Sequence, residues 1–155
     1  MKQRIYIDTS VVGGYFDDEF SADTVAFFER VKNGELMIIV SDLLEAELLR
    51  APEFVRELLL SIPKQQIEKI KLSPEAIELA DKYIAAKVVG KTSRGDCQHI
   101  AIATLSKADV LVSWNFKHIV NLTRIRGYNG INYQNGHNMI EIRTPKEITN
   151  YGNEN

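Results

Sequence analysis

The chain has 155 residues, of which 45% are hydrophobic and 26% charged, and its formal net charge is −2. These values are ordinary for one globular domain and exclude a disordered chain, a collagen and a generally basic nucleic-acid coat. The single cysteine, Cys97, excludes an internal disulfide framework and a metal site built from several cysteines. No apolar run approaches the roughly 20 residues of a membrane span, and low cysteine content suits a reducing compartment. We therefore expect a cytoplasmic protein with no membrane contact.

Strands and helices are expected to alternate in the first half of the chain. Residues 4–7 and 36–40 are short, apolar and rich in β-branched side chains, and the second run suits a strand buried on both faces. Gly13 and Gly14 are expected to break the pattern after the first strand. Helices are predicted from Ser21 or Asp23 to about Asn33, from 43 to 50 with Ser41 or Asp42 as cap, and, after Ala51-Pro52, from 53 to 60.

The second half continues the alternation. Ser73, Pro74 and Glu75 form a strong helix start, with a capping hydroxyl, a proline and an acid in the first turn. Asp96 opens a further helix after a polar loop. The remaining predictions are a short strand at 67–72, a buried strand at 109–113, a short helix at 116–121, a loop at 123–137 and an edge strand at 139–143.

This order predicts a three-layer α/β/α sandwich with a mostly parallel central sheet. We expect one domain at residues 3–148, followed by a polar tail at 149–155 whose end frays. In such sheets, ligands bind beyond the carboxyl ends of the strands. That edge is therefore the place to look for functional side chains.

Several oxygen-bearing side chains are predicted to meet at this edge. Asp8 directly follows the first strand, Asn115 follows the strand at 109–113, and Asp96 begins a helix that enters the same region. Glu45 and Glu47 lie on the helix after the second strand; they are two residues apart and cannot share one helix face. Asp, Glu and Asn oxygens suit Mg²⁺ or Mn²⁺. Turn formation and helix capping explain each of these residues equally well when it is taken alone.

Four segments, in their order and spacing, resemble the PIN-domain family, which includes the VapC-type toxins of bacterial and archaeal toxin–antitoxin pairs. Residues 6–11 are similar to the family's opening strand with its first catalytic aspartate, and residues 112–118 to its fourth, strand-end segment. Counted from Ser41 in the segment 41–48, Glu47 matches the family's glutamate, with Glu45 as the fallback. Residues 95–103 are similar to the helix that begins with the third acid. The resemblance covers about residues 3–148 and implies a PIN-like fold.

The resemblance implies a divalent-metal-dependent endoribonuclease that acts as the toxin of a type II toxin–antitoxin pair. It assigns catalysis and the binding of Mg²⁺ or Mn²⁺ to Asp8, Glu47, Asp96 and Asn115. It also implies an RNA substrate, a small antitoxin partner and a homodimer. The apolar helices of residues 43–60 are the expected partner surface, although ordinary core packing explains their apolar faces as well.

Other side chains are expected to support this site. Thr9 and Ser10 could hydrogen-bond a phosphate or a ligand carboxylate, or simply cap a turn, and His99 could order a carboxylate or fill the core. Trp114 and Tyr128 could stack on unpaired bases, and core packing at the strand end is the alternative for Trp114. The candidates for phosphate contacts on a basic rim are Lys91, Arg94, Lys117, Arg124 and Arg126.

Two positions depart from the family pattern. Many relatives carry aspartate where this chain has Asn115, and the next position that is often acidic is Lys117. Both changes weaken the hold on a second cation. They also keep open an RNA- or protein-binding module with a weakened metal site. A haloacid-dehalogenase-like phosphatase is a further alternative, although its pattern requires a second acid where this chain has Ser10.

Overall fold

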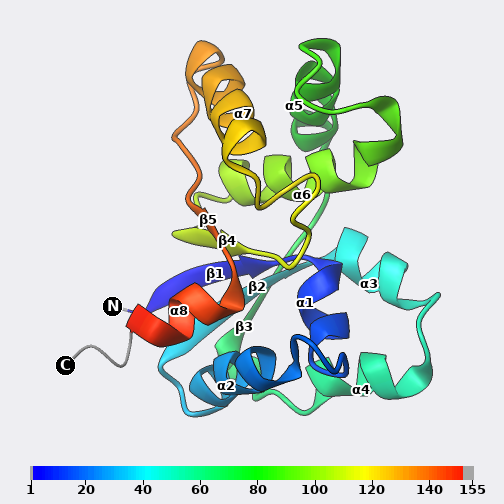
Figure 1. Cartoon of the computed structure of the whole chain (residues 1–155), viewed down its shortest axis with the longest axis vertical. Coiled ribbons are helices and arrows are strands. Elements are labelled where there is room, and N and C mark those ends of the chain that lie inside the picture. Colours follow the sequence, from blue (N-terminus) through cyan, green and yellow to red (C-terminus); the bar gives the residue numbers. More distant parts are fainter. Residues whose placement is uncertain (1, 152–155) are drawn as a thin grey trace.

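The computed structural model describes residues 2–151 and has a five-stranded, all-parallel sheet at its centre (Figure 1). The strand order is β3-β2-β1-β4-β5, so that β1 is central and β3 and β5 are the edges. The strands are β1 Gln3–Ile7, β2 Leu36–Ser41, β3 Ile67–Ile70, β4 Val110–Val112 and β5 Ile142–Arg143. The predicted α/β/α class with a parallel sheet is confirmed.

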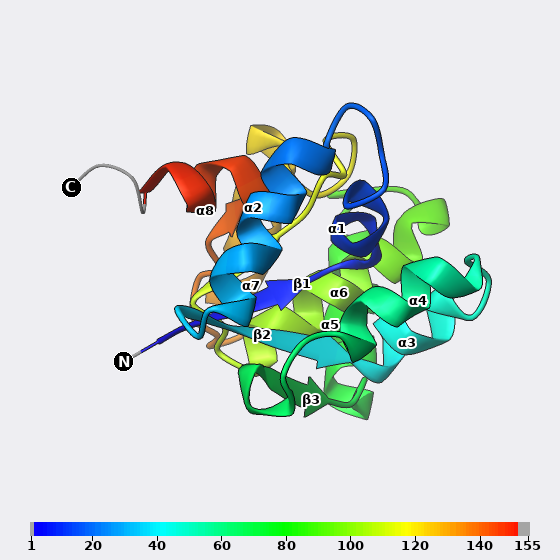
Figure 2. The ribbon, with the colours of Figure 1, turned by 90° about the horizontal axis from the view of Figure 1, so that it is seen from below.

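Helices cover both faces of the sheet, which gives the three layers (Figures 1 and 2). Helices α5, α6 and α7 lie on one face, while α1, α2, α4 and α8 lie on the other. Their bounds are α1 Thr9–Gly14, α2 Ser21–Lys32, α3 Asp42–Leu48, α4 Glu53–Leu60, α5 Pro74–Ala85, α6 Arg94–Leu105, α7 Leu122–Gln134 and α8 Pro145–Tyr151. Short 3₁₀ helices occupy Lys64–Gln66 and Lys91–Ser93.

Two separate cores result from the alternation of side chains along the strands. In β1, Ile5 and Ile7 point into the core beneath α1, α2 and α4, whereas Tyr6 points into the core beneath α5, α6 and α7. Successive strand residues face opposite sides of a sheet, so a strand covered on both faces must be apolar throughout. This explains why β4 and nearly all of β2 are apolar in the sequence.

Local capping signals fix several helix starts. The Ser73 hydroxyl accepts a hydrogen bond from the Ala76 N–H at 3.1 Å, and the Ser41 hydroxyl accepts one from the Leu44 N–H at 3.1 Å. A side-chain oxygen at this position satisfies an N–H that has no partner within the helix. Both predicted starts are confirmed, and Ser41, rather than Asp42, is the cap of α3.

The predicted short helix at 116–121 and loop at 123–137 are wrong. Residues 116–120 form turns, and the segment classed as loop is largely helix α7. Asparagine, glycine and tyrosine have low helix propensity, but here tertiary contacts outweigh it. Asn132 accepts from the Tyr83 hydroxyl at 2.5 Å and donates to the Thr104 hydroxyl at 3.2 Å. A Cβ at Gly127 would lie 2.7 Å from a methyl carbon of Val88, so this glycine allows close packing.

Other differences concern chain ends and breaks. The predicted interruption of regular structure at Gly13 and Gly14 is wrong, because both residues lie in helix α1. The last strand is confirmed as an edge strand, but it covers only Ile142–Arg143. Helix α8 occupies the start of the predicted polar tail, and residues 152–155 of that tail lie outside the described residues. Within residues 2–151, no helix is both long enough and apolar enough to cross a bilayer.

Gly14→Ala should lower the free energy of unfolding by about 1–3 kcal/mol, the usual cost of overpacking. A Cβ there would lie 2.6 Å from Cδ1 of Trp114 and 3.1 Å from Oγ1 of Thr24. The Trp114 ring cannot easily move away, because it stacks on Phe20 at 4.4 Å and its indole N–H donates to Thr24. Urea denaturation measures the change.

Gly13→Ala is the matched control in the same helix. Nothing lies within 4 Å of a Cβ at this position, and alanine favours helix over glycine by up to about 1 kcal/mol. Its stability should stay level or rise. Equal losses in the two variants would contradict the close-approach explanation.

Candidate functional site

The predicted site residues lie around the carboxyl edge of the sheet. Asp8 follows β1, Ser113 follows β4, and Ser41 ends β2 at the start of α3, which carries Glu47. Asp96 lies in the first turn of α6. Because all strands are parallel, their carboxyl ends share one edge. The fold therefore brings segments far apart in the sequence to the same region.

Asp8 is the most deeply buried carboxylate of the site, with 3% of its surface exposed. The Ser10 hydroxyl donates to its Oδ1 at 2.6 Å, and the Ser113 hydroxyl donates to its Oδ2 at 2.7 Å. Burial raises the pKa of Asp8, and nearby Asp96 raises it further, while the hydrogen bonds from the two hydroxyls act in the opposite direction. The net shift is upward, so the fold holds this acid where its charged form is costly.

Glu47 is held from one side through a single oxygen. Its Oε1 lies 2.5 Å from Nε2 of His99 and accepts from the Thr9 hydroxyl at 3.0 Å. Partial burial disfavours its charge, but the contacts with His99 and Thr9 outweigh that cost and lower the pKa of Glu47. Glu47 is therefore ionised more readily than Asp8.

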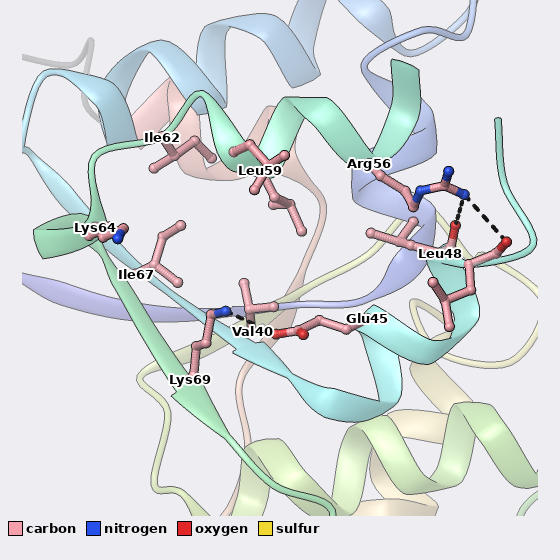
Figure 3. Close-up of a pocket in the computed structure, with 11 residues that line it drawn as sticks. Val40, Glu45, Leu48, Arg56, Leu59, Ile62, Lys64, Ile67 and Lys69 are labelled. Atoms are coloured by element: carbon pink, nitrogen blue, oxygen red, sulfur yellow. Dashed lines mark hydrogen bonds and ion pairs between the residues drawn. The ribbon is translucent and has the colours of Figure 1, made fainter. Parts of the chain in front are cut away.

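Glu45 points elsewhere. It forms an ion pair with Lys69 at 3.5 Å across an apolar pocket on the outer side of α3 (Figure 3). The structure thus places Glu47, and not Glu45, with the other predicted site residues.

Asp96 and Asn115 are joined by His118. Nδ1 of His118 lies 3.0 Å from Oδ2 of Asp96, and the backbone N–H of His118 donates to Oδ1 of Asn115 at 3.0 Å. The backbone N–H of Asn115 in turn donates to the Ser113 hydroxyl at 2.9 Å. The Asn115 amide oxygen therefore stabilises the turn after β4, the structural role that the sequence left open beside metal binding.

The donor set suits a divalent cation in its chemistry, but the side chains are not arranged as a ready-made binding group. Among residues 2–151, no three His, Cys, Asp or Glu side chains are placed to hold a metal ion together. Two carboxylate oxygens, Oε2 of Glu47 and Oδ1 of Asp96, accept no hydrogen bond from the described residues. Free carboxylate oxygens beside the buried Asp8 are ligands that Mg²⁺ and Mn²⁺ prefer. Metal binding would require at least one of these carboxylates to move.

The basic candidates fall into two groups. Arg94 pairs with Asp81 of α5, and Arg124 donates to the carbonyl of Val88, so both are engaged within the fold. The other three are exposed and make no ion pair with another described residue: Lys91, Lys117 and Arg126. These three side chains are freer to bind a phosphate than the two arginines, whose guanidinium groups already have partners within the fold.

Sequence reasoning missed part of the network. Ser113 and His118 connect Asp8, Asn115 and Asp96, but nothing in their spacing separated them from ordinary core and surface residues. The proposed stacking residues Trp114 and Tyr128 are both buried, so neither offers a face to a base. Core packing, which the sequence offered as the alternative for Trp114, is what the structure shows for both residues.

Asp8→Asn should make the folded protein more stable at neutral pH, by about 0.5–2 kcal/mol, as is common when a strained functional group is replaced. The raised pKa of Asp8 means that the folded state holds its proton more tightly than the unfolded state. Its cost is therefore absent below the ordinary pKa of aspartate and grows as pH rises toward the folded value. Thermal denaturation between pH 4 and 8 measures the difference.

The gain of the Asp8→Asn variant over wild type should shrink as the pH falls. Asp18→Asn, a change at an exposed aspartate, is the control and should show no such trend. A variant that is less stable than wild type at every pH would show that the charge of Asp8 stabilises the fold.

No protein-family model matches the sequence, and no curated protein matches it either. The structure is similar to a chain in the crystal structure of VapBC2 from Rickettsia felis bound to a DNA fragment from its promoter, with a TM-score of 0.54. The match covers 92% of this chain and 98% of that chain, at 16% sequence identity. An identity this low establishes the fold alone. The chain therefore shares its fold with the matched VapBC2 chain.

Proposed function

We propose that this protein is a divalent-metal-dependent endoribonuclease and the toxin component of a type II toxin–antitoxin pair. The observation that carries the proposal is the buried Asp8, whose pKa is raised, at the carboxyl edge of the central strand, with Glu47 and Asp96 on flanking helices. Perturbed carboxylates gathered at such an edge are typical of catalytic sites. The fold relation to VapBC2 and the four resembling segments support the same reading.

Asp8, Glu47 and Asp96 would hold Mg²⁺ or Mn²⁺, which supplies Lewis acidity to activate water and to neutralise charge on the phosphate. The hydroxyls of Ser10 and Ser113 hold both oxygens of Asp8 in a fixed orientation. Thr9 and His99 do the same for one oxygen of Glu47. Side chains that are already fixed lose less conformational entropy when the metal binds.

RNA must approach an acidic site, so positive charge around it is needed. The exposed Lys91, Lys117 and Arg126 would attract phosphates of the strand on either side of the scissile bond. Such contacts position the backbone without reading its sequence. The target RNA would then be chosen by other features of the surface.

Wild-type protein should cleave a labelled, unstructured RNA with Mg²⁺ or Mn²⁺ and lose that activity in EDTA. Asp8→Asn should abolish cleavage while the protein stays folded, as judged by circular dichroism. A folded wild type that neither cleaves RNA nor binds Mn²⁺ in calorimetry would reject the nuclease. That outcome would favour the RNA- or protein-binding module. Two features support this alternative: the Asn115 amide oxygen already accepts from the His118 N–H, and Lys117 is exposed.

Glu47→Gln and Glu45→Gln form a matched pair within this experiment. The first change should lower the cleavage rate by about 100-fold or more, since even partners of metal ligands matter by about 10- to 100-fold. The second should leave the rate almost unchanged, because Glu45 pairs with Lys69 away from the site. The reverse ranking would move the second acid to Glu45.

The antitoxin would dock beside this site, in the apolar pocket between α3, α4 and β3 (Figure 3). The pocket has a volume of about 680 Å³. Its floor consists of Val40, Leu48, Leu59, Ile62 and Ile67, and its charged rim of Glu45, Arg56, Lys64 and Lys69. Three bases face one acid, and that acid is already paired. The pocket therefore suits an amphipathic segment with an apolar face and acidic flanks.

Leu60→Glu should weaken the complex with such a partner by about 10-fold or more. Leu60 is 83% exposed beside the pocket, so the change should leave the fold intact while adding a charge that repels an acidic segment. The measurement is co-purification with the co-expressed product of the adjacent open reading frame. Leu122→Glu is the control, because Leu122 is 64% exposed on α7, away from the pocket. Equal recovery of partner with both variants would exclude this docking site.

A further inference from the structure

A chain of four hydrogen bonds runs through the interior and ends on Glu47. The Leu44 N–H donates to the Ser41 hydroxyl at 3.1 Å, and that hydroxyl lies 2.8 Å from the Tyr6 hydroxyl. The Tyr6 hydroxyl lies 2.6 Å from Nδ1 of His99, whose Nε2 lies 2.5 Å from Oε1 of Glu47. Tyr6 and Ser41 are fully buried and His99 is 2% exposed, so water does not replace these bonds.

Counting donors and acceptors gives the chain one direction. Among the described residues, the Tyr6 oxygen is the one acceptor that the Ser41 hydroxyl can reach, so Ser41 donates its hydrogen to Tyr6. Tyr6 then has its hydrogen left to donate, and it can donate only to Nδ1 of His99. An Nδ1 that accepts leaves the imidazole proton on Nε2, where it faces the carboxylate of Glu47.

The opposite direction leaves a group unsatisfied. If Nδ1 carried the proton, Tyr6 would donate to Ser41, and the Ser41 hydrogen would have no acceptor among the described residues. A buried hydroxyl without a partner costs about 1–3 kcal/mol. Burial also raises the pKa of Tyr6, which keeps the phenol protonated as a donor.

We infer that His99 is a positioning residue for Glu47: the Tyr6 hydroxyl donates to Nδ1 of His99 and so leaves Nε2 to donate to the carboxylate of Glu47. The inference rests on the proposed function only in treating Glu47 as a ligand. The elements that contribute are β1, the end of β2, α3 and α6. Asp8 directly follows β1, while α3 carries Glu47 and α6 carries Asp96.

This arrangement leaves the second oxygen of Glu47 free for a ligand. Thr9 and His99 both contact Oε1, while Oε2 accepts no hydrogen bond from any residue of the described chain. Gly95 directly precedes Asp96, and a Cβ added at Gly95 would lie 4.0 Å from Oε2 of Glu47. The missing side chain at Gly95 keeps this space open. His99 thus turns the free oxygen of Glu47 toward the region of Asp96.

The first test is the tautomer of His99, read from the ¹⁵N chemical shifts of its ring at a fixed neutral pH without metal. Wild type should show a protonated Nε2 and an unprotonated Nδ1. Tyr6→Phe removes one oxygen and keeps the ring, so His99 should then show a mixture of tautomers. The affinity for Mn²⁺, measured by calorimetry, should fall by about 10-fold in Tyr6→Phe.

Tyr83→Phe is the matched control. Tyr83 is also buried, and its replacement by phenylalanine removes one hydrogen bond, to Asn132 at 2.5 Å. Tyr83 lies in α5 against α7 and takes no part in the hydrogen bonds that link Ser41 to Glu47. It should cost stability while leaving both the His99 tautomer and the Mn²⁺ affinity unchanged. A wild-type His99 protonated on Nδ1, or a tautomer unchanged by Tyr6→Phe, would overturn the inference. If the protein binds no Mn²⁺, the proposed function fails, yet the tautomer still decides this inference.

Discussion

The arrangement of this sheet edge depends on Asp8, a carboxylate whose charged form is destabilised by burial. Asp8 ends the central strand, and its two oxygens accept from Ser10 at the start of α1 and from Ser113 at the end of β4. The Ser10 hydroxyl oxygen also accepts from the backbone N–H of Trp114, which ties α1 to the segment after β4. These bonds offset part of the desolvation cost but not all of it, since the pKa of Asp8 remains raised. Because one carboxylate joins the ends of two strands, the shape of this edge and the electrostatics of the site cannot change independently.

Helix α6 sets the positions of the remaining acids. Its first turn carries Asp96 and, three residues later on the same face, His99. His99 contacts Glu47 of α3, while His118, from the turn after β4, contacts Asp96 itself. Each acid is therefore held by a histidine from a different element. A shift of α6 would move both acids relative to Asp8. The packing of α6 against α5 and the sheet therefore determines the geometry of the site as much as the acids do.

The parts of the fold that sequence could predict are those with local causes. The buried strands are continuous apolar runs, and the caps at Ser41 and Ser73 act within four residues of themselves. Helix α7 could not be predicted in this way, because buried contacts of Asn132 with distant helices compensate for its poor propensity. Gly14 likewise has its reason in Trp114, one hundred residues later in the chain. Asp8 was found by its position after a strand, and Ser10 and His99 by their closeness in sequence to Asp8 and Asp96. Ser113 and His118, which hold Asp8 and Asp96, have no local signature.

The charges at the edge of the sheet bear on how many cations such a site could hold. A second cation needs negative charge on its own side, which the resembled family often supplies after the last buried strand. Here that position is Asn115, whose oxygen already accepts from the His118 N–H, and Lys117 follows it, exposed. The three acids Asp8, Glu47 and Asp96 can balance one divalent cation with a single negative charge to spare. A second would leave the site positive next to a lysine, in a region where partial burial strengthens repulsion. If the site binds a metal as proposed, this charge balance favours one cation over two.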